Sequence, residues 1–115
     1  MVVGLLSESE SDLVFQALAD ATRRDILVRS IKAEDSVSGL ARHYEMSLTA
    51  VQKHVAVLER AGLVTKERRG REQLVHAQSP RLREAAALLD AYEQLWIDRV
   101  TKIAEILGGE EGEQR

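Results

Sequence analysis

The chain has 115 residues, of which 44% are hydrophobic and 30% charged, which is enough for one folded domain but not for two. It contains no cysteine, so disulfides, thiolate metal sites and a cysteine nucleophile are excluded. The apolar run at the start is too short for a signal peptide, and no segment is suited to span a bilayer, so a cytoplasmic location without membrane contact is expected. Only 3% of the residues are aromatic, so the core must be aliphatic, which favours helices.

The net charge of -3 conceals an uneven distribution along the chain. Residues 38–76 carry 7 basic and 4 acidic side chains, whereas the segments on both sides are net acidic. A basic centre between acidic flanks is typical of a surface that meets nucleic acid. Ordinary scatter of surface charge would give the same pattern, so the charge alone leaves both interpretations open.

Four helices are predicted in succession in the first half of the chain. The first spans about residues 9–19, where apolar residues recur at helical spacing. Each of the next three begins after a residue whose side-chain oxygen can accept a hydrogen bond from a free helix amide: Asp20, either Ser36 or Ser38, and Ser47. Gly62 lies just past the end of the fourth helix, where a left-handed residue is usually needed.

The pattern then changes to a β-hairpin and a long helix. Residues 63–68 and 72–76 are β-compatible runs, and Gly70 between them supplies the positive φ of a tight turn. Pro80 suits the first turn of a last helix that runs to Leu107. Residues 1–108 are therefore predicted to form a single domain, and residues 109–115 a flexible acidic tail.

This order of elements predicts a mainly α fold with a small β-hairpin, a winged helix-turn-helix of the order α-α-α-α-β-β-α. The turn Glu45-Met46-Ser47 is short enough to set the third and fourth helices at a steep angle, so that the fourth can lie in the major groove of DNA. On a helical projection the inward face consists of Val51, Val55, Leu58 and Gly62, and the outward face of Leu48, Thr49, Gln52, Lys53 and Ala56. The outward face has no acidic residue, although a solvated amphipathic helix remains the alternative.

Two stretches of the chain resemble the ArsR-type (arsenic-repressor-like) winged-helix repressors of bacteria: ALADATRRDIL at residues 17–27 and SLTAVQKHVAVLERAGLV at residues 47–64. The family usually has Pro where Ala21 stands and Leu where Val55 stands, and neither change threatens the fold. The resemblance implies a homodimer paired through the first and last helices. It also implies repression by occupying an operator, usually with release by an inducer.

The candidate DNA contacts lie at the start of the fourth helix and at the hairpin tip. They are Ser47, Leu48, Thr49, Gln52, Lys53, His54, Arg68, Arg69 and Arg71. Gln52 can make a bidentate contact to adenine, and Lys53 can meet guanine or a phosphate. The three arginines match the family's wing, which tracks the DNA backbone or enters the minor groove. Arg23 and Arg24, on the second helix, are predicted to pair with nearby carboxylates.

The apolar stripe of the last helix is too long for one small domain to cover, so part of it is predicted to face a second subunit. The candidate dimerisation residues are Leu13, Leu89, Tyr92, Trp96, Val100 and Ile103. For Trp96, packing on the first helix of its own chain is the alternative.

The resemblance also implies two possible metal sites, since many members of the family sense metals through a Cys-x-Cys pair on the third helix or through carboxylates and histidines on the last. Neither site has its ligands in this sequence. Ser36 and Ser38 fall where a cysteine pair would be, and the last helix has no histidine after His76. No metal or other cofactor is therefore expected. The releasing signal stays open: a small organic inducer, a partner protein, or none.

Two other classes of function compete with the DNA-binding one. An enzyme is disfavoured, because the chain has no glycine-rich phosphate loop, no HExxH and no nucleophile elbow. A winged helix that binds protein instead of DNA is the closer rival, since a fold does not dictate its function. Steep weakening of DNA binding with salt would distinguish a DNA binder, because counterions are released from the phosphates.

Overall fold

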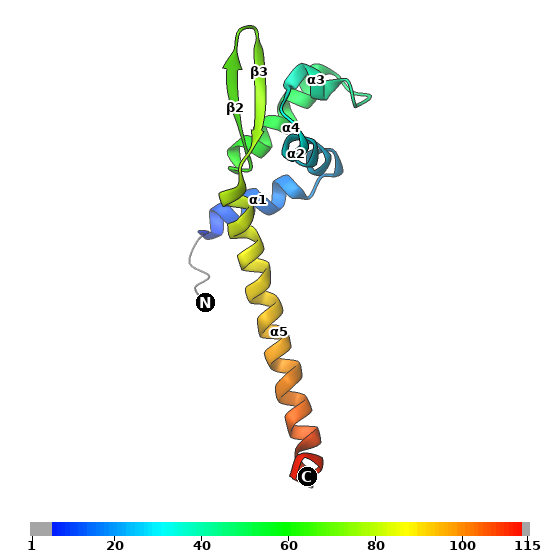
Figure 1. Cartoon of the computed structure of the whole chain (residues 1–115), viewed down its shortest axis with the longest axis vertical. Coiled ribbons are helices and arrows are strands. Elements are labelled where there is room, and N and C mark those ends of the chain that lie inside the picture. The colour runs from blue at the N-terminus through cyan, green and yellow to red at the C-terminus, as the bar shows by residue number, and fades with distance from the viewer. Residues whose placement is uncertain (1–5, 114–115) are drawn as a thin grey trace.

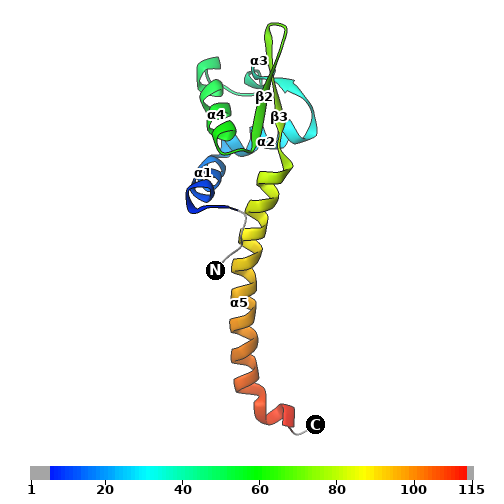
Figure 2. The same ribbon diagram turned by 90° about the vertical axis from the view of Figure 1, so that its left-hand side faces the viewer.

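The computed structural model of the chain describes the backbone of residues 6–113 and the side chains of residues 6–108. Its elements are α1 (Glu8–Leu18), α2 (Ala21–Lys32), β1 (Asp35–Ser36), α3 (Val37–Ala41), α4 (Leu48–Arg60), β2 (Val64–Arg69), β3 (Glu72–Ala77) and α5 (Ser79–Glu113). The first four helices and the sheet gather at one end of the molecule, and α5 leaves them as a long single helix (Figures 1 and 2). No helix of the described chain is both long and apolar enough to cross a membrane.

The predicted hairpin is present, but it belongs to a sheet of three strands in the order β1-β3-β2, all antiparallel. Gly70 has a φ of 66° between the hairpin strands, as predicted, and no other residue type in the described chain has a positive φ. Strand β1 was not predicted from the sequence. It is only two residues long, with Asp35 opposite Val75 and Ser36 opposite Leu74, so it has no periodicity of its own.

The core is aliphatic, as the composition predicts. Val51, Val55 and Leu58 of α4 are fully buried, which confirms these three members of the predicted inward face, whereas the fourth, Gly62, lies past the end of α4 and is partly buried. The three α4 residues pack with residues of the other helices and of the sheet, including Val14, Ile26, Leu40, Val64 and Val75. This packing holds α4 with its opposite face toward solvent.

Side-chain caps set the start of the helices. Asp20 accepts a hydrogen bond from the amide of Arg23 at 3.0 Å, and Ser47 accepts one from Ala50 at 3.1 Å, as predicted. Of the two serines considered for α3, Ser36 is the cap, with 2.9 Å between its Oγ and the amide nitrogen of Gly39. Ser7 forms a capping box at α1 with Glu10, because both donors are satisfied reciprocally.

The predicted carboxylate pairing of Arg23 and Arg24 is wrong. Arg23 donates from Nε to the carbonyl of Ala17 at 2.8 Å, and Arg24 donates to the carbonyl of Leu18 at 2.7 Å. The last carbonyls of a helix have no partner within the helix, and a cation near them complements the helix dipole. The two guanidinium groups therefore fasten the end of α1 to the start of α2.

A polar cluster ties the segment after α3 to α2. The hydroxyl of Tyr44 donates to Asp25 at 2.6 Å, and Arg29 pairs with the same carboxylate oxygen at 2.8 Å. These two hydrogen bonds hold the pKa of Asp25 below its ordinary value, while burial and the bond to Asp25 raise the pKa of Tyr44 to about 12.

The connection from α3 to α4 covers residues 42–47, which is longer than the predicted three-residue turn.

Helix α5 runs to Glu113, past the end predicted at Leu107. It continues through Gly108, because a glycine inside a helix costs only about 1 kcal/mol and does not block the next turn. Residues 109–113 of the predicted flexible tail are thus helical, and residues 114–115 lie outside the described chain.

Candidate nucleic-acid interface

The exposed face of α4 carries the residues predicted to contact DNA. Thr49, Gln52 and Lys53 are exposed, and Leu48 at the first position of the helix is 45% exposed. No acidic residue occurs between Glu45 and Glu59, so this face presents no charge that would repel phosphates. The arrangement is suited to a groove lined with phosphates on both sides.

The start of α4 is a second feature of this face. Ser47 is exposed, and its Oγ already accepts the amide of Ala50. Its hydroxyl proton is left to donate to a phosphate, next to the remaining free amides of the first turn. The partial positive charge of the helix terminus acts in the same direction.

His54, which the sequence groups with the DNA contacts, is less exposed than Gln52 and Lys53, with 21% of its side chain accessible. Its Nδ1 is 3.2 Å from a terminal guanidinium nitrogen of Arg23 and 3.8 Å from the carboxylate of Asp20. Asp20 itself has a lowered pKa, chiefly through the hydrogen bond from the Arg23 amide. His54 therefore links α4 to the junction of α1 and α2, and its contact with DNA stays a prediction.

The wing, which is the hairpin of β2 and β3, contacts α4 through an ion pair that the sequence did not indicate. Lys66 of β2 lies 3.4 Å from the carboxylate of Glu59, one residue before the end of α4. The pair is partly exposed, so it contributes little stability. The firmer attachment of the hairpin is Val64, which is fully buried in the core beside α4.

The three wing arginines have different surroundings. Cross-strand pairing places Arg68 opposite Gln73 and Lys66 opposite Val75, so Arg68 and Lys66 share the sheet face turned to α4. Within the described residues, no hydrogen bond or ion pair holds the side chains of Arg68 and Arg71, both of which are exposed.

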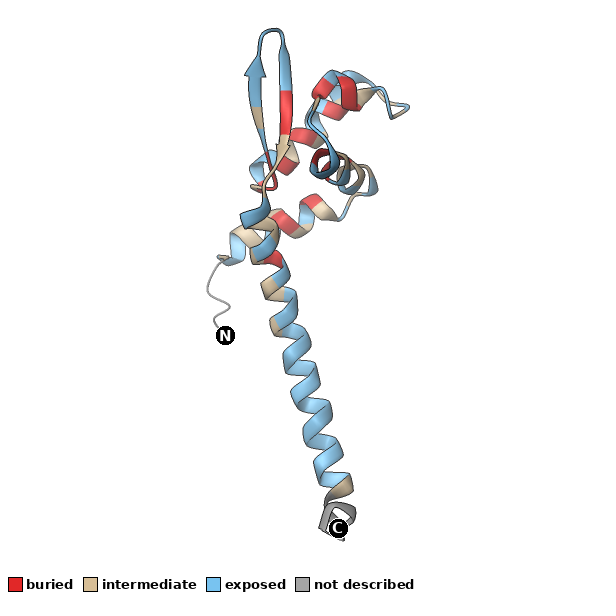
Figure 3. Cartoon of the chain, viewed as in Figure 1, coloured by how far each residue is buried: buried red, intermediate tan, exposed pale blue. Residues whose placement is uncertain are grey.

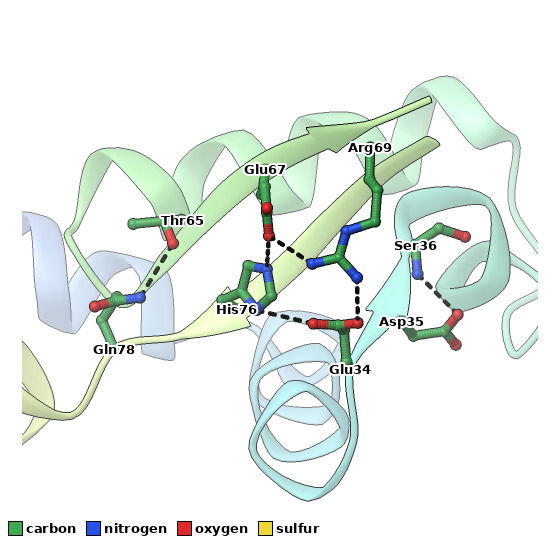
Figure 4. Close-up of polar contacts among 8 residues, drawn as sticks. All are labelled: Glu34, Asp35, Ser36, Thr65, Glu67, Arg69, His76 and Gln78. Carbon is green, nitrogen blue, oxygen red and sulfur yellow. Dashed lines mark hydrogen bonds and ion pairs between the residues drawn. The ribbon is translucent and has the colours of Figure 1, made fainter. Parts of the chain in front are cut away.

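Arg69 lies on the opposite face and is held by two carboxylates. Its guanidinium is 3.2 Å from Glu34 and 3.1 Å from Glu67 (Figure 4). His76 joins the same group, with Nε2 2.8 Å from Glu67 and Nδ1 3.6 Å from Glu34. The hydrogen bond from His76 and the nearby Arg69 hold the pKa of Glu67 below its ordinary value. The charge of Arg69 is thus neutralised by acidic partners, unlike the charges of Arg68 and Arg71.

The distal part of α5 presents an uncovered apolar face, which Figure 3 shows as exposed along most of its length. Its exposed members include Leu89, Tyr92, Trp96, Val100 and Ile103, the five α5 residues predicted for dimerisation. Trp96 is 65% exposed, so it does not pack on α1 of its own chain. Leu13, the sixth, lies against the core of its own chain and is partly buried.

Among the described residues, no group of three or more histidine, aspartate or glutamate side chains is placed to hold a metal ion. Ser36, one of the two serines at the position of the family's cysteine pair, is buried and acts as a helix cap.

Comparison with known proteins gives the same assignment as the geometry. The model of a family described as "Bacterial regulatory protein, arsR family" matches residues 20–66. The HTH-type transcriptional regulator Rv2034 of Mycobacterium tuberculosis is 33% identical over 99 residues, which cover 86% of this chain and 90% of that protein.

Solved structures agree with this. An ArsR-like transcriptional regulator from Rhodococcus sp. RHA1 is 35% identical, with a TM-score of 0.75, over 85% of this chain and 92% of that one. A homodimeric winged helix-turn-helix DNA-binding domain from Mycobacterium bovis, described as a possible ArsR-family regulator, is 27% identical, with a TM-score of 0.59, over 83% of this chain and 90% of that one. The chain therefore belongs to the arsR family of bacterial regulatory proteins and is a transcriptional regulator with a DNA-binding winged helix-turn-helix.

Proposed function

We propose that this regulator is a homodimeric repressor that occupies a palindromic operator in the cytoplasm, with no catalytic step. The observation that carries the proposal is the acid-free, exposed face of α4 together with a wing whose Arg68 and Arg71 have no partner among the described residues. A winged helix that binds only protein has no need for this combination.

The proposed contacts divide by role. Gln52 and Lys53 lie about one turn inside α4, where a major-groove helix presents its base-reading side chains. Ser47, Thr49 and the free amides of the first turn bind phosphate and fix the helix in register. Leu48 packs against a thymine methyl group. Arg68 and Arg71 reach the backbone or the minor groove beyond.

A homodimer repeats these contacts in two half-sites. The M. bovis neighbour is described as homodimeric, and the exposed apolar face of α5 supplies a surface for the same assembly here. Two-fold symmetry of the protein requires an inverted repeat in the DNA, with half-site centres about one helical turn, or a multiple of it, apart.

The Gln52→Ala variant tests this function. The operator is first selected from random DNA with the wild-type protein, and binding is then followed by fluorescence anisotropy over a range of salt concentrations. A bidentate base contact discriminates between sequences, so the variant is expected to lose about 1–3 kcal/mol per contact on the operator and little on random DNA.

Gln16→Ala is a matched control, because Gln16 is an exposed glutamine of α1, outside α4 and the hairpin. Equal losses of the Gln52 variant on both DNAs would assign Gln52 to a phosphate. Failure to select any operator, with no salt-dependent DNA binding, would favour the protein-binding alternative.

We further propose that the regulator does not respond to metals. Its serines at residues 36 and 38 and the absence of histidine after His76 leave both family sites without their usual ligands. Zinc, cobalt, cadmium and arsenite are expected to leave operator affinity unchanged in anisotropy titrations. Release from DNA at stoichiometric metal, reversed by a chelator, would contradict this.

A further inference from the structure

A cavity of about 660 Å³ lies where the end of α2, the end of β3 and the start of α5 meet. Leu27, Ile31 and Leu82 are part of its apolar lining, and Glu34, His76 and Gln78, called its polar edge here, are part of its polar lining. Its lining thus includes residues of the wing and of α5, the helix predicted to form the dimer interface. A molecule in it would contact both.

The polar edge offers acceptors on Glu34 and Gln78, whereas the ring nitrogens of His76 already face Glu67 at 2.8 Å and Glu34 at 3.6 Å. The Gln78 amide nitrogen donates to Thr65 at 3.0 Å, which leaves the Gln78 side-chain oxygen available (Figure 4). The hydroxyl of Ser30, another lining residue, already donates to the carbonyl of Ile26 at 2.8 Å. The Glu34 carboxylate accepts from Arg69, but its side chain is 47% exposed. A ligand matched to this edge must therefore bring donors.

Glu34 has two partners, Arg69 at 3.2 Å and His76 at 3.6 Å, and both of these also contact Glu67. The Arg69 side chain is 59% exposed, and exposed ion pairs of this kind contribute little free energy. Arg69 would also keep Glu67 as a second carboxylate after leaving Glu34. A cationic group placed in the cavity can take over Glu34 without leaving any charge unpaired.

We propose that this cavity is an effector site for a small organic cation, with an apolar body on Leu27, Ile31 and Leu82 and an amidinium, guanidinium or ammonium head on Glu34. A planar head with two parallel N–H groups fits a carboxylate best, since it forms two charge-assisted hydrogen bonds. Lys32 also lines the cavity and opposes a cation, but its side chain is exposed, so its ammonium can turn to solvent.

The effector site acts on the wing through Arg69, and this step rests on the proposed DNA-binding function. When the ligand head occupies Glu34, Arg69 keeps one carboxylate partner instead of two and is freer to reach a phosphate. The ligand is therefore expected to tighten DNA binding. By linkage, DNA that engages Arg69 tightens ligand binding by the same factor.

Benzamidine is the probe for the site, because it combines a phenyl ring with a planar amidinium. It is titrated into the DNA-free protein by NMR and calorimetry, at constant chloride, with the neutral benzamide as the matched ligand. We expect saturable binding of one benzamidine per chain in the millimolar range, with shifts at residues lining the cavity. Benzamide should bind at least fivefold more weakly.

Three variants locate the charge that the ligand contacts. Glu34→Gln is expected to weaken benzamidine binding at least fivefold, and Lys32→Gln to strengthen it. Glu93→Gln, at an exposed carboxylate of α5 outside the cavity, should leave it unchanged. Equal binding of benzamidine and benzamide, or an undiminished affinity in a folded Glu34→Gln protein, would overturn the effector site.

A measurement of DNA affinity with and without benzamidine tests the coupling separately. Saturating benzamidine is expected to raise wild-type DNA affinity two- to tenfold and to have no effect on Arg69→Ala. Benzamidine binding that leaves wild-type DNA affinity unchanged would overturn the coupling through Arg69, while the site itself stands. Absence of DNA binding by the protein alone would instead contradict the proposed function.

Discussion

Replacing Trp96 by alanine is expected to convert the homodimer into monomers. Trp96 is 65% exposed in the single chain and lies in the middle of the apolar face that runs from Leu89 to Leu107. If two copies of α5 pack through this face, each Trp96 is buried in the dimer, and truncating a buried tryptophan costs about 3–5 kcal/mol. Alanine is the best helix former, so α5 itself should persist.

Sedimentation equilibrium over nanomolar to micromolar protein measures this effect, with circular dichroism to confirm the helix. Gln94→Ala is the matched control, because Gln94 lies on the side of α5 opposite Trp96, where it donates to Asp98. The control should remain dimeric at concentrations that dissociate the Trp96 variant. A wild-type monomer at micromolar concentration, or an unchanged dimer in the variant, would contradict the proposed interface.

Local signals in the sequence predicted most of the fold. Asp20 and Ser47 cap their helices, and Gly70 has the positive φ expected of the hairpin turn. Each depends on a residue and its nearest neighbours along the chain, so its physical requirement can be recognised without the tertiary structure. The buried and exposed faces of α4 were predicted for the same reason, since they follow from helical periodicity.

Features that depend on distant parts of the chain were not predicted. Strand β1 forms because β3 offers it a partner, and its two residues carry no pattern. Arg23 was predicted to pair with a carboxylate, but it donates a hydrogen bond to the carbonyl of Ala17 at the end of α1. Arg69 resembles Arg68 and Arg71 in sequence, and only the pleat of the hairpin and the position of Glu34 separate it from them. The pleat and the carboxylate of Glu67 are local to the hairpin, but the contact with Glu34 depends on a distant part of the chain and has no local signal.

Because Arg68 and Arg71 lack the carboxylate partners of Arg69 within the described structure, we expect these two residues to contribute strongly to DNA binding. Changing Arg68 and Arg71 together to alanine should weaken binding to operator and random DNA alike, because phosphate contacts carry no sequence information. Each phosphate contact contributes about 0.9 to the slope of log affinity against log salt. Loss of two arginines from each of two subunits should therefore flatten the slope by roughly 3–4 units.

Arg69→Ala tests whether its carboxylate partners matter. Its effect should be clearly smaller than that of either Arg68→Ala or Arg71→Ala, because Glu34 and Glu67 already neutralise Arg69 in the free protein. Arg83→Ala, at an exposed arginine of α5 outside the wing, should leave the slope unchanged. These slopes are measured by anisotropy on both DNAs over the same salt range. An unchanged slope in the double variant would mean that the hairpin does not contact DNA. Equal losses of DNA affinity for all three single variants would mean that Arg69 leaves its carboxylates for DNA at no loss of free energy.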